Sequence, residues 1–233
     1  MESKVATIIV TYNGELYIQK CLEKVLDQVD PRSVYVIDNG SNDNTLELVE
    51  PFNVNVLKSK VNLGFGRANN LGMRKAIEDG FDYVFLLNQD CYLEPGCIYS
   101  LSSVLSQHPE IGILSPLHKN RSADGWDPGF ELHLGKSHIK LSINEPTKDL
   151  HYVHFVNAAA WLIPVKMLEK TGGFDPIFSH YGEDDNLVNR AHYHGYKVAV
   201  FDFPCVIHDR LLKPHGWGDR QIASATRRPE PPG

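Results

Sequence analysis

The sequence has few of the residues that crosslink small secreted domains or hold structural metal ions. Only four cysteines occur among the 233 residues, and none has the spacing of a metal site. They are Cys21, Cys91, Cys97 and Cys205. Nothing at the amino terminus resembles a cleavable signal. We therefore expect a protein that folds without disulfides in a reducing cytoplasm.

Long hydrophobic runs and an excess of positive charge are also missing. The longest apolar stretches are Val5–Val10, Tyr83–Leu87 and Ala158–Val165, far short of the roughly 18 residues that span a bilayer. With 23 Lys and Arg against 29 Asp and Glu, the net charge is -6. The surface as a whole therefore does not favour nucleic acid or anionic lipid, and a bound polyanion must be held locally.

The sequence does contain an alternation of short apolar runs and longer amphipathic stretches. The predicted strands are Val5–Val10, Val34–Ile37, Val54–Leu57 and Tyr83–Leu87, and the predicted helices are Leu16–Leu26, a helix from about Thr45, and Gly64–Asp79. This order favours an α/β fold with a mostly parallel central sheet flanked by helices. We expect one domain over residues 1–226 and a frayed tail over residues 227–233.

Polar residues follow three of these strands at the point where each one ends. They are Thr11-Tyr12-Asn13, Asp38-Asn39 and Asn88-Gln89-Asp90. Because parallel sheets bind ligands at the carboxyl ends of their strands, the three groups predict one shared site. Each of them, taken alone, is equally typical of an ordinary turn.

The second half of the chain is less regular. Residues 117–151 are polar with weak alternation, which favours an exposed hairpin or a mobile loop. A strand near Asn157–Trp161 brings in Trp161, either to stack on a sugar or to fill the core. The acidic run Glu183–Asp185 opens a helix over Asn186–His194, and strands are expected over Lys197–Phe201 and up to His208. His180 and Tyr181 have the same two interpretations as Trp161.

Five segments in order resemble the family 2 glycosyltransferases, and within that family the bacterial rhamnosyltransferase-like members. They are Ile9–Asn13, Val36–Thr45, Asn62–Gly72, Phe85–Asp90, and Gly172–Asp175 with Tyr181–Asp184. The resemblance covers about residues 5–210. It implies the A-type glycosyltransferase fold, with a Rossmann-like nucleotide-sugar-binding half over 5–90 and an acceptor-binding and catalytic half over 91–210.

The resemblance implies roles for the residues that follow the first strands. Thr11, Tyr12, Asn13 and Asp38 would hold the uridine or thymidine of a UDP or dTDP sugar. Arg67, at the start of a helix, would meet the phosphate oxygens. The alternative is that the glycines around Arg67 serve only turns and packing.

Asn88-Gln89-Asp90 stands where the family has its Asp-x-Asp metal motif. The resemblance makes Asp90 the ligand of Mg²⁺ or Mn²⁺, and Asn88 a neutral helper that brings no charge. His208 resembles the family histidine that helps to bind the metal or the diphosphate. Two alternatives stay open, namely a structural histidine and a mechanism that depends little on metal and relies on Arg67 or His208.

Glu183 and Asp184 are the catalytic candidates. By family position Asp184 is the base that takes the proton from the acceptor hydroxyl in a single, inverting displacement. The alternative is that these acids only favour a helix N-terminus.

The expected function is transfer of a sugar from a nucleoside diphosphate to a glycan or lipid-linked glycan in the synthesis of cell-surface polysaccharide. The expected location is the cytoplasm, peripherally at the inner face of the membrane. A decayed nucleotide-sugar- or glycan-binding module is the alternative, motivated by Asn88 in place of an acid. A sugar nucleotidyltransferase would have a glycine-rich basic loop after Val10, which this chain lacks.

Overall fold

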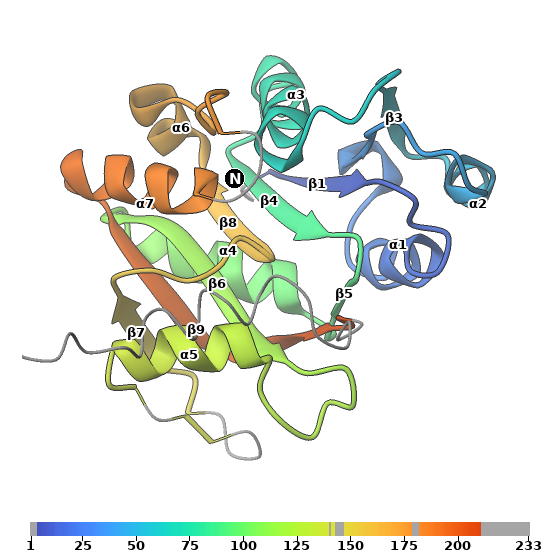
Figure 1. The fold of residues 1–233 in the computed structure, drawn as a ribbon. Helices are drawn as coiled ribbons and strands as arrows, with labels where there is room; N and C mark the ends of the chain where they lie inside the picture. Colours follow the sequence, from blue (N-terminus) through green and yellow to red (C-terminus); the bar gives the residue numbers. More distant parts are fainter. Residues whose placement is uncertain (1–3, 140, 143–146, 179–181, 211–233) are drawn as a thin grey trace, which may run out of the picture.

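The structure, a computed structural model, describes residues 4–139, 141–142, 147–178 and 182–210 (Figure 1). The expected tail over 227–233, His180 and Tyr181 lie outside these residues. Within them a single nine-stranded sheet runs in the order β3-β2-β1-β4-β8-β6-β9-β5, and β7 pairs with β9. The strands are β1 (Val5–Thr11), β2 (Val34–Asp38), β3 (Asn55–Lys58), β4 (Tyr83–Asn88), β5 (Cys91–Leu93), β6 (Ile111–Lys119), β7 (Leu150–Val153), β8 (Ala160–Pro164) and β9 (Lys197–His208).

Helices cover both faces of the sheet. They are α1 (Ile18–Leu26), α2 (Thr45–Val49), α3 (Phe65–Glu78), α4 (Cys97–Gln107), α5 (Pro128–Lys136), α6 (Val165–Thr171) and α7 (Glu183–Tyr193), with 3-10 turns at Pro31–Ser33 and Glu50–Phe52. Neighbouring strand residues point to opposite faces, so Ile8 joins the core beneath α3 and α7 whereas Ile9 joins the core beneath α1 and α4. Figure 1 shows α3, α6 and α7 gathered on one side of the sheet.

The direction of the strands changes along the sheet. β1 is parallel to β2 and β4, and β2 is parallel to β3, as the apolar runs predict. β8 is antiparallel to both β4 and β6, while β9 is parallel to β6. The α/β fold is therefore confirmed, with a parallel first half and a mixed second half.

The segment 117–151 was expected to be a hairpin or a mobile loop, and that expectation is wrong. It contains the end of β6 and the helix α5, whose Phe130 is fully buried. The helix begins at an N-cap, where the Asp127 side chain accepts from the Phe130 backbone N–H, and Pro128 occupies the first turn. This local start signal outweighs the weak alternation that suggested strands.

Two other boundaries differ from the expected ones. The last helix begins at Glu183 rather than Asn186, so the three acids form its first turn. The two late strands are one long strand, β9, which ends at His208. Gly182, with φ of 92°, provides the left-handed turn before α7, a conformation that glycine adopts without the strain of a Cβ.

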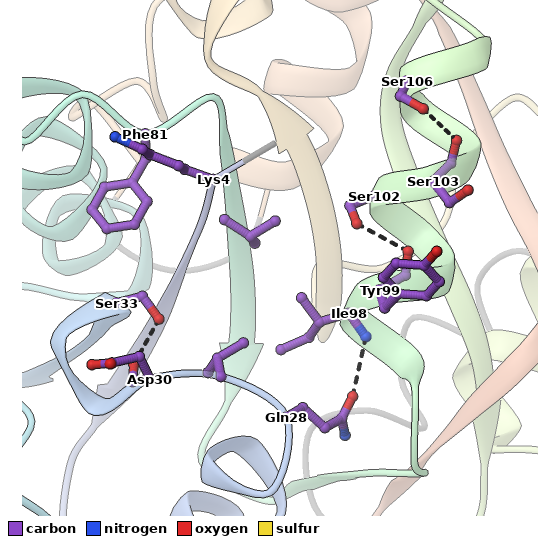
Figure 2. A pocket seen from close by; sticks show the side chains of 12 residues that line it. Lys4, Gln28, Asp30, Ser33, Phe81, Ile98, Tyr99, Ser102, Ser103 and Ser106 are labelled. Carbon is purple, nitrogen blue, oxygen red and sulfur yellow. Dashed lines mark hydrogen bonds between the residues drawn. The ribbon is translucent and has the colours of Figure 1, made fainter. Parts of the chain in front are cut away.

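The amino-terminal edge of the sheet contains a hollow that is separate from the predicted site. A cavity of about 580 Å³ lies there, between the start of β1 and the helix α4, and is lined by Lys4, Gln28, Tyr99 and three serines of α4 (Figure 2). The predicted site residues follow the opposite ends of the strands. Over the described ranges no helix has the length and apolar character needed to cross a bilayer.

Candidate functional site

Side chains from distant parts of the chain meet at the carboxyl edge of the sheet. Thr11 lies beside Asp38 in the β1–β2 register, and Asn88 lies beside Val10 in the β1–β4 register. β9 ends at the same edge because it runs parallel to β6, which is separated from β4 by a single antiparallel strand. The topology therefore brings His208 to the edge that the sequence assigned to Asp38 and Asn88.

Asn13 joins the loops that follow β1 and β2. It adopts a left-handed backbone, with φ of 48°; its N–H donates to Ser41 Oγ at 3.0 Å and its Oδ1 accepts from the Asn42 N–H at 2.9 Å. The Gly14 N–H donates to Thr45 Oγ1 at 2.7 Å. Asn13, which the sequence predicts to bind the nucleotide, therefore has a structural role as well, because it fixes the loop after β1 against the loop after β2.

Asp38 is the last residue of β2 and Tyr12 directly follows β1, and their side chains differ in exposure. Asp38 is buried, and its Oδ1 accepts from the Ser41 N–H at 3.2 Å. Tyr12 is 42% exposed, so its ring is available to an incoming ligand. A buried carboxylate beside an exposed ring suits a nucleotide base, which needs a hydrogen-bond partner and a flat apolar surface.

Gln89 connects the first strand to the loop that carries Asp90, a contact that sequence reasoning missed. Its Oε1 accepts from Thr11 Oγ1 at 2.5 Å and from the Tyr12 N–H at 3.1 Å, and its Nε2 donates to the Tyr12 carbonyl at 3.4 Å. The bonds are tertiary contacts between segments far apart in the chain, so no local sequence signal announces them. Gln89 therefore links the loop after β1, which carries Tyr12, to the loop after β4, which carries Asp90.

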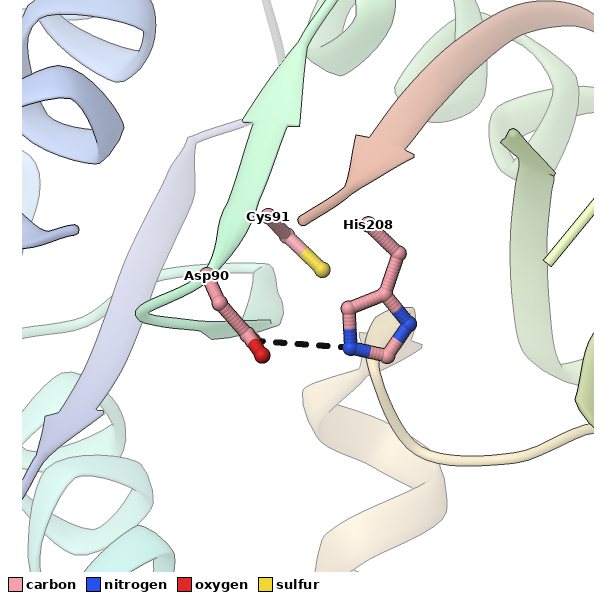
Figure 3. A group of neighbouring side chains, drawn as sticks. All are labelled: Asp90, Cys91 and His208. Carbon is pink, nitrogen blue, oxygen red and sulfur yellow. Dashed lines mark ion pairs between the residues drawn. The ribbon is translucent and has the colours of Figure 1, made fainter. Parts of the chain in front are cut away.

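Asp90, Cys91 and His208 form the group of potential metal ligands at this edge (Figure 3). Asp90 Oδ1 lies 3.5 Å from His208 Nε2, and one donor atom from each of the three residues lies within 4.8 Å of the others. Burial, with a smaller effect of Asp90, raises the pKa of the Cys91 thiol, so its sulfur stays protonated. The carboxylate and the imidazole are the donors that fit a divalent cation here.

His208 is itself buried between two carboxylates. Its Nδ1 lies 3.3 Å from Asp127 Oδ2, and within the part of the chain that the structure describes neither atom makes a hydrogen bond of good geometry. Burial alone would lower the pKa of His208, but Asp127 and Asp90 outweigh it and raise the pKa. Burial would raise the pKa of Asp127, and here His208 and Arg210 outweigh it and lower the pKa.

A second buried histidine lies behind His208. The His118 ring meets the His208 ring edge to face at 6.3 Å and stacks on Phe130 at 4.6 Å, while its Nε2 is 3.0 Å from Ser115 Oγ. Burial, and then the neighbouring His208, lowers the pKa of His118 to about 3. His118 is therefore neutral at physiological pH and supports the ring in front of it by packing.

The acidic residues at the start of α7 have contrasting surroundings. Glu183 is buried, and its Oε2 has no hydrogen-bond partner among the described residues, whereas Asp185 is exposed. Asp184 lies between these extremes, and its Oδ1 accepts from the Asp185 N–H at 2.9 Å. Burial first, and then the charges of Asp185 and Glu183, raise the pKa of Asp184. A carboxylate with raised pKa is suited to accept a proton.

Close packing on α3 places the start of α7 at the carboxyl edge. A Cβ built on Gly66 would lie 2.9 Å from the Phe174 Cβ and 3.6 Å from the Glu183 Cβ. Gly66 belongs to the first turn of α3, which begins after the carboxyl end of β3. The acid pair Glu183 and Asp184 therefore lies near the edge that carries Asp38.

Arg67 and Trp161 both make contacts within the protein. The Arg67 guanidinium donates from Nε and Nη2 to the Pro176 carbonyl, at 3.0 and 2.6 Å, and so ties α3 to the segment before α7. Trp161 is fully buried and stacks on Phe174 at 6.4 Å, so it fills the core. Two arginines form ion pairs with acids next to His208: Arg210 Nε lies 3.8 Å from Asp127 Oδ2, and Arg121 Nε lies 3.0 Å from Asp209 Oδ1.

Known proteins are similar to this chain in sequence and in fold. The sequence model described as "Glycosyl transferase family 2" matches residues 6–172. The poly-beta-1,6-N-acetyl-D-glucosamine synthase of Staphylococcus epidermidis is 25% identical over 126 residues, 51% of this chain and 30% of the synthase. The dTDP-rhamnosyl transferase RfbG of Shigella flexneri is 31% identical over 90 residues, 35% of this chain and 31% of that protein. The chain therefore spans about a third of the length of these relatives.

The fold is also found in a solved structure. The mannosyltransferase PcManGT of Pyrobaculum calidifontis, in complex with GDP-Man and Mn²⁺, superposes with a TM-score of 0.70 over 100% of this chain and 66% of its own. At 19% identity this likeness shows the fold and no more.

Proposed function

The chain belongs to glycosyl transferase family 2, and from that premise we propose that it transfers a sugar from a nucleoside diphosphate to a hydroxyl group of a glycan or lipid-linked glycan. One observation carries the proposal. At one edge of the sheet the buried carboxylate of Asp38, suited to a nucleotide base, lies with the acid–imidazole pair of Asp90 and His208. One named relative is a poly-beta-1,6-N-acetyl-D-glucosamine synthase and the other a dTDP-rhamnosyl transferase, which supports a glycan as the acceptor.

In the proposed reaction Asp184 is the base. An inverting transfer is one displacement at the anomeric carbon, so a carboxylate must take the acceptor proton on the face opposite the leaving diphosphate. The raised pKa of Asp184 supports this role, because a more basic carboxylate accepts a proton more readily. Such a base is worth about 10²–10⁴ in rate. Glu183, buried beside it, raises that basicity through its negative charge.

Asp90 and His208 would hold a divalent cation, Mg²⁺ or Mn²⁺, which neutralises charge on the leaving diphosphate. Asn88 supplies a neutral side chain where many relatives have an acid, so the charge at the site comes from Asp90. Arg210, beside Asp127, offers a second positive charge at the same corner.

The donor is a UDP or dTDP sugar in this proposal. Asp38 accepts from the base, and Tyr12 offers its exposed ring to the base or the ribose. The Thr11 hydroxyl donates to Gln89, so Thr11 fixes the loop rather than binding the nucleotide. Arg67 reaches a phosphate only by leaving the Pro176 carbonyl.

The continuous sheet supports one domain over residues 1–226 with two working halves. In the proposed division, residues 5–90 bind the donor, and residues 91–210 bind the acceptor and carry the base. β4 and β8, one from each half, pair along five residues, so the halves share a backbone interface.

Turnover of a donor panel tests the proposal. UDP, dTDP and GDP sugars are incubated with Mn²⁺ or Mg²⁺, and release of nucleoside diphosphate is followed with and without glycan acceptors. We expect transfer that falls about 10²–10⁴-fold in Asp184→Asn. The matched control is Asp185→Asn, because Asp185 is an exposed carboxylate in the same helical turn. Its charge contributes less than burial to the raised pKa of Asp184, so we expect the rate to fall far less than in Asp184→Asn.

The neutral Asn88 favours one alternative, a module that binds nucleotide sugars without turning them over. Tight nucleotide binding by calorimetry, together with no transfer or hydrolysis for any donor, would support that module. Equal rates in Asp184→Asn and the wild type would instead remove the assignment of the base while leaving the transferase intact.

A further inference from the structure

We infer that Asp127 is a positioning residue that fixes the tautomer of His208, so that the Nε2 lone pair faces the cation held by Asp90. The inference rests on the proposed function for the presence of the cation. It goes further in assigning a residue outside the ligand set to the site.

The first step is the geometry around the imidazole. Asp127 Oδ2 lies 3.3 Å from His208 Nδ1, and Asp90 Oδ1 lies 3.5 Å from His208 Nε2. Each ring nitrogen therefore faces one carboxylate. The two carboxylates differ in burial, since the Asp127 side chain is 1% exposed and that of Asp90 is 23% exposed.

That difference decides which nitrogen carries the proton. A carboxylate accepts hydrogen bonds and donates none, so Asp127 holds Nδ1 in its protonated form. A bound cation would take the place of the proton on Nε2, so the neutral ring keeps its one N–H at Nδ1 and presents the Nε2 lone pair toward the open side where Asp90 is. An outer carboxylate that orients a histidine in this way is a general support of metal ligands.

The second step is that the two carboxylate oxygens of Asp127 have different surroundings. Oδ1 accepts from the Phe130 N–H at 3.0 Å and caps α5, while Oδ2 has no hydrogen-bond partner among the described residues. The Asp127 N–H in turn donates to the His118 carbonyl at 2.9 Å, so its backbone is fixed as well. The cap explains Oδ1 and leaves Oδ2 to the imidazole at 3.3 Å and, farther away at 3.8 Å, to the Arg210 guanidinium.

The separation of roles makes Asp127→Asn a sharp probe. The amide oxygen can still cap α5, but the amide nitrogen then faces His208 Nδ1 and donates to it. The proton of the neutral ring is expected to move to Nε2, which removes the lone pair that the cation needs. Asp127→Ser keeps a good cap and removes the second oxygen altogether.

The experiment measures Mn²⁺ binding by electron paramagnetic resonance, with saturating UDP, in five proteins. They are the wild type, Asp127→Asn, His208→Ala, the double variant, and the control Asp124→Asn. Asp124 is an exposed carboxylate in the same loop, and its Oδ1 accepts a hydrogen bond from Asn120. We expect Asp127→Asn to weaken Mn²⁺ binding about 10–100-fold and Asp124→Asn to leave it unchanged. The double variant should bind Mn²⁺ no worse than His208→Ala.

Unchanged Mn²⁺ affinity in Asp127→Asn, or losses that simply add in the double variant, would overturn the inference. Urea unfolding of Asp127→Asn and Asp127→Ser checks that the cap survives. If the wild type binds no Mn²⁺, the metal in the proposed function is wrong. The inference is then decided by nitrogen NMR of the metal-free protein: a wild-type His208 protonated at Nδ1, moving to Nε2 in Asp127→Asn, supports it, and a wild-type ring protonated at Nε2 refutes it.

Discussion

Replacing Gly66 with alanine tests whether α3 and the start of α7 are packed as closely as the structure has them. The new Cβ would lie 2.9 Å from the Phe174 Cβ, whereas carbon atoms prefer about 3.5–4.0 Å. The helix or the Phe174 segment must therefore shift by roughly half an ångström. Phe174 has little room to move, because its ring packs against Phe65 at 5.6 Å and against Trp161 at 6.4 Å.

The expected cost follows from two opposing effects. Overpacking in a core costs about 1–3 kcal/mol. Alanine returns about 1 kcal/mol in a helix interior, because glycine loses more backbone entropy on folding. Gly66→Ala should therefore lower the free energy of unfolding by about 0–2 kcal/mol.

Gly135→Ala is the matched control, because Gly135 is also helical and a Cβ there would meet nothing within 4 Å. We expect it to raise the free energy of unfolding by up to about 1 kcal/mol. The difference between the two variants in urea unfolding isolates the overpacking at Gly66, about 1–3 kcal/mol. In melting temperature, each kcal/mol corresponds to about 2–4 °C for a chain of this size.

Transfer activity provides a second, independent readout of the same contact. A displacement of about 1 Å at a reacting group can cost on the order of 10² in rate, so a shift passed to Glu183 and Asp184 should slow transfer measurably in Gly66→Ala. Gly135→Ala should keep the wild-type rate. If Gly66→Ala is stabilised as much as Gly135→Ala and transfers normally, the close approach of α3 to Phe174 is not present in solution.

Three other outcomes follow from the site. The pKa of Asp184 is raised in the folded chain, so just above the ordinary pKa of an aspartate this side chain binds more protons in the folded than in the unfolded chain. The free energy of unfolding should therefore fall as pH rises through this window, and urea unfolding of Asp184→Asn should show a flatter dependence on pH. Gln89→Ala removes the acceptor of Thr11 Oγ1 and the Tyr12 N–H, and each lost bond is worth about 0.5–1.5 kcal/mol, so calorimetry should show weaker UDP binding. Excess chelator should stop transfer and Mn²⁺ should restore it; transfer that continues in chelator would take the cation out of the reaction.

The edge of the sheet could be predicted because its causes are local. The runs Val5–Val10 and Tyr83–Leu87 are continuous and apolar, so their ends, and the polar residues after them, were readable from the sequence. The same holds for Asp38, which is the last of the five residues of β2, all of them buried. The parallel register then brought these residues together without any further information.

The remaining parts depend on tertiary contacts or on a signal that was overlooked. Asp127 followed by Pro128 is a helix start that the sequence does contain, and reading it would have placed α5. The bonds of Gln89 to Thr11, and the approach of Asp127 to His208, have no local pattern, because each partner lies in a distant segment. Arg67 was assigned to phosphate from its place in a helix start, and nothing in that pattern reveals the Pro176 carbonyl.

The place of β9 in the sheet affects how the molecule assembles. β9 supplies His208, and it pairs with β5, β6 and β7, all of which precede it in the chain. During synthesis the ribosome must therefore release nearly every described residue before Asp90 gains its imidazole neighbour. A growing chain would hold Asp38 and Asp90 long before it could hold a cation between Asp90 and His208. Cation affinity would then report completion of the fold, and a bound cation would favour the finished sheet over its partly assembled forms.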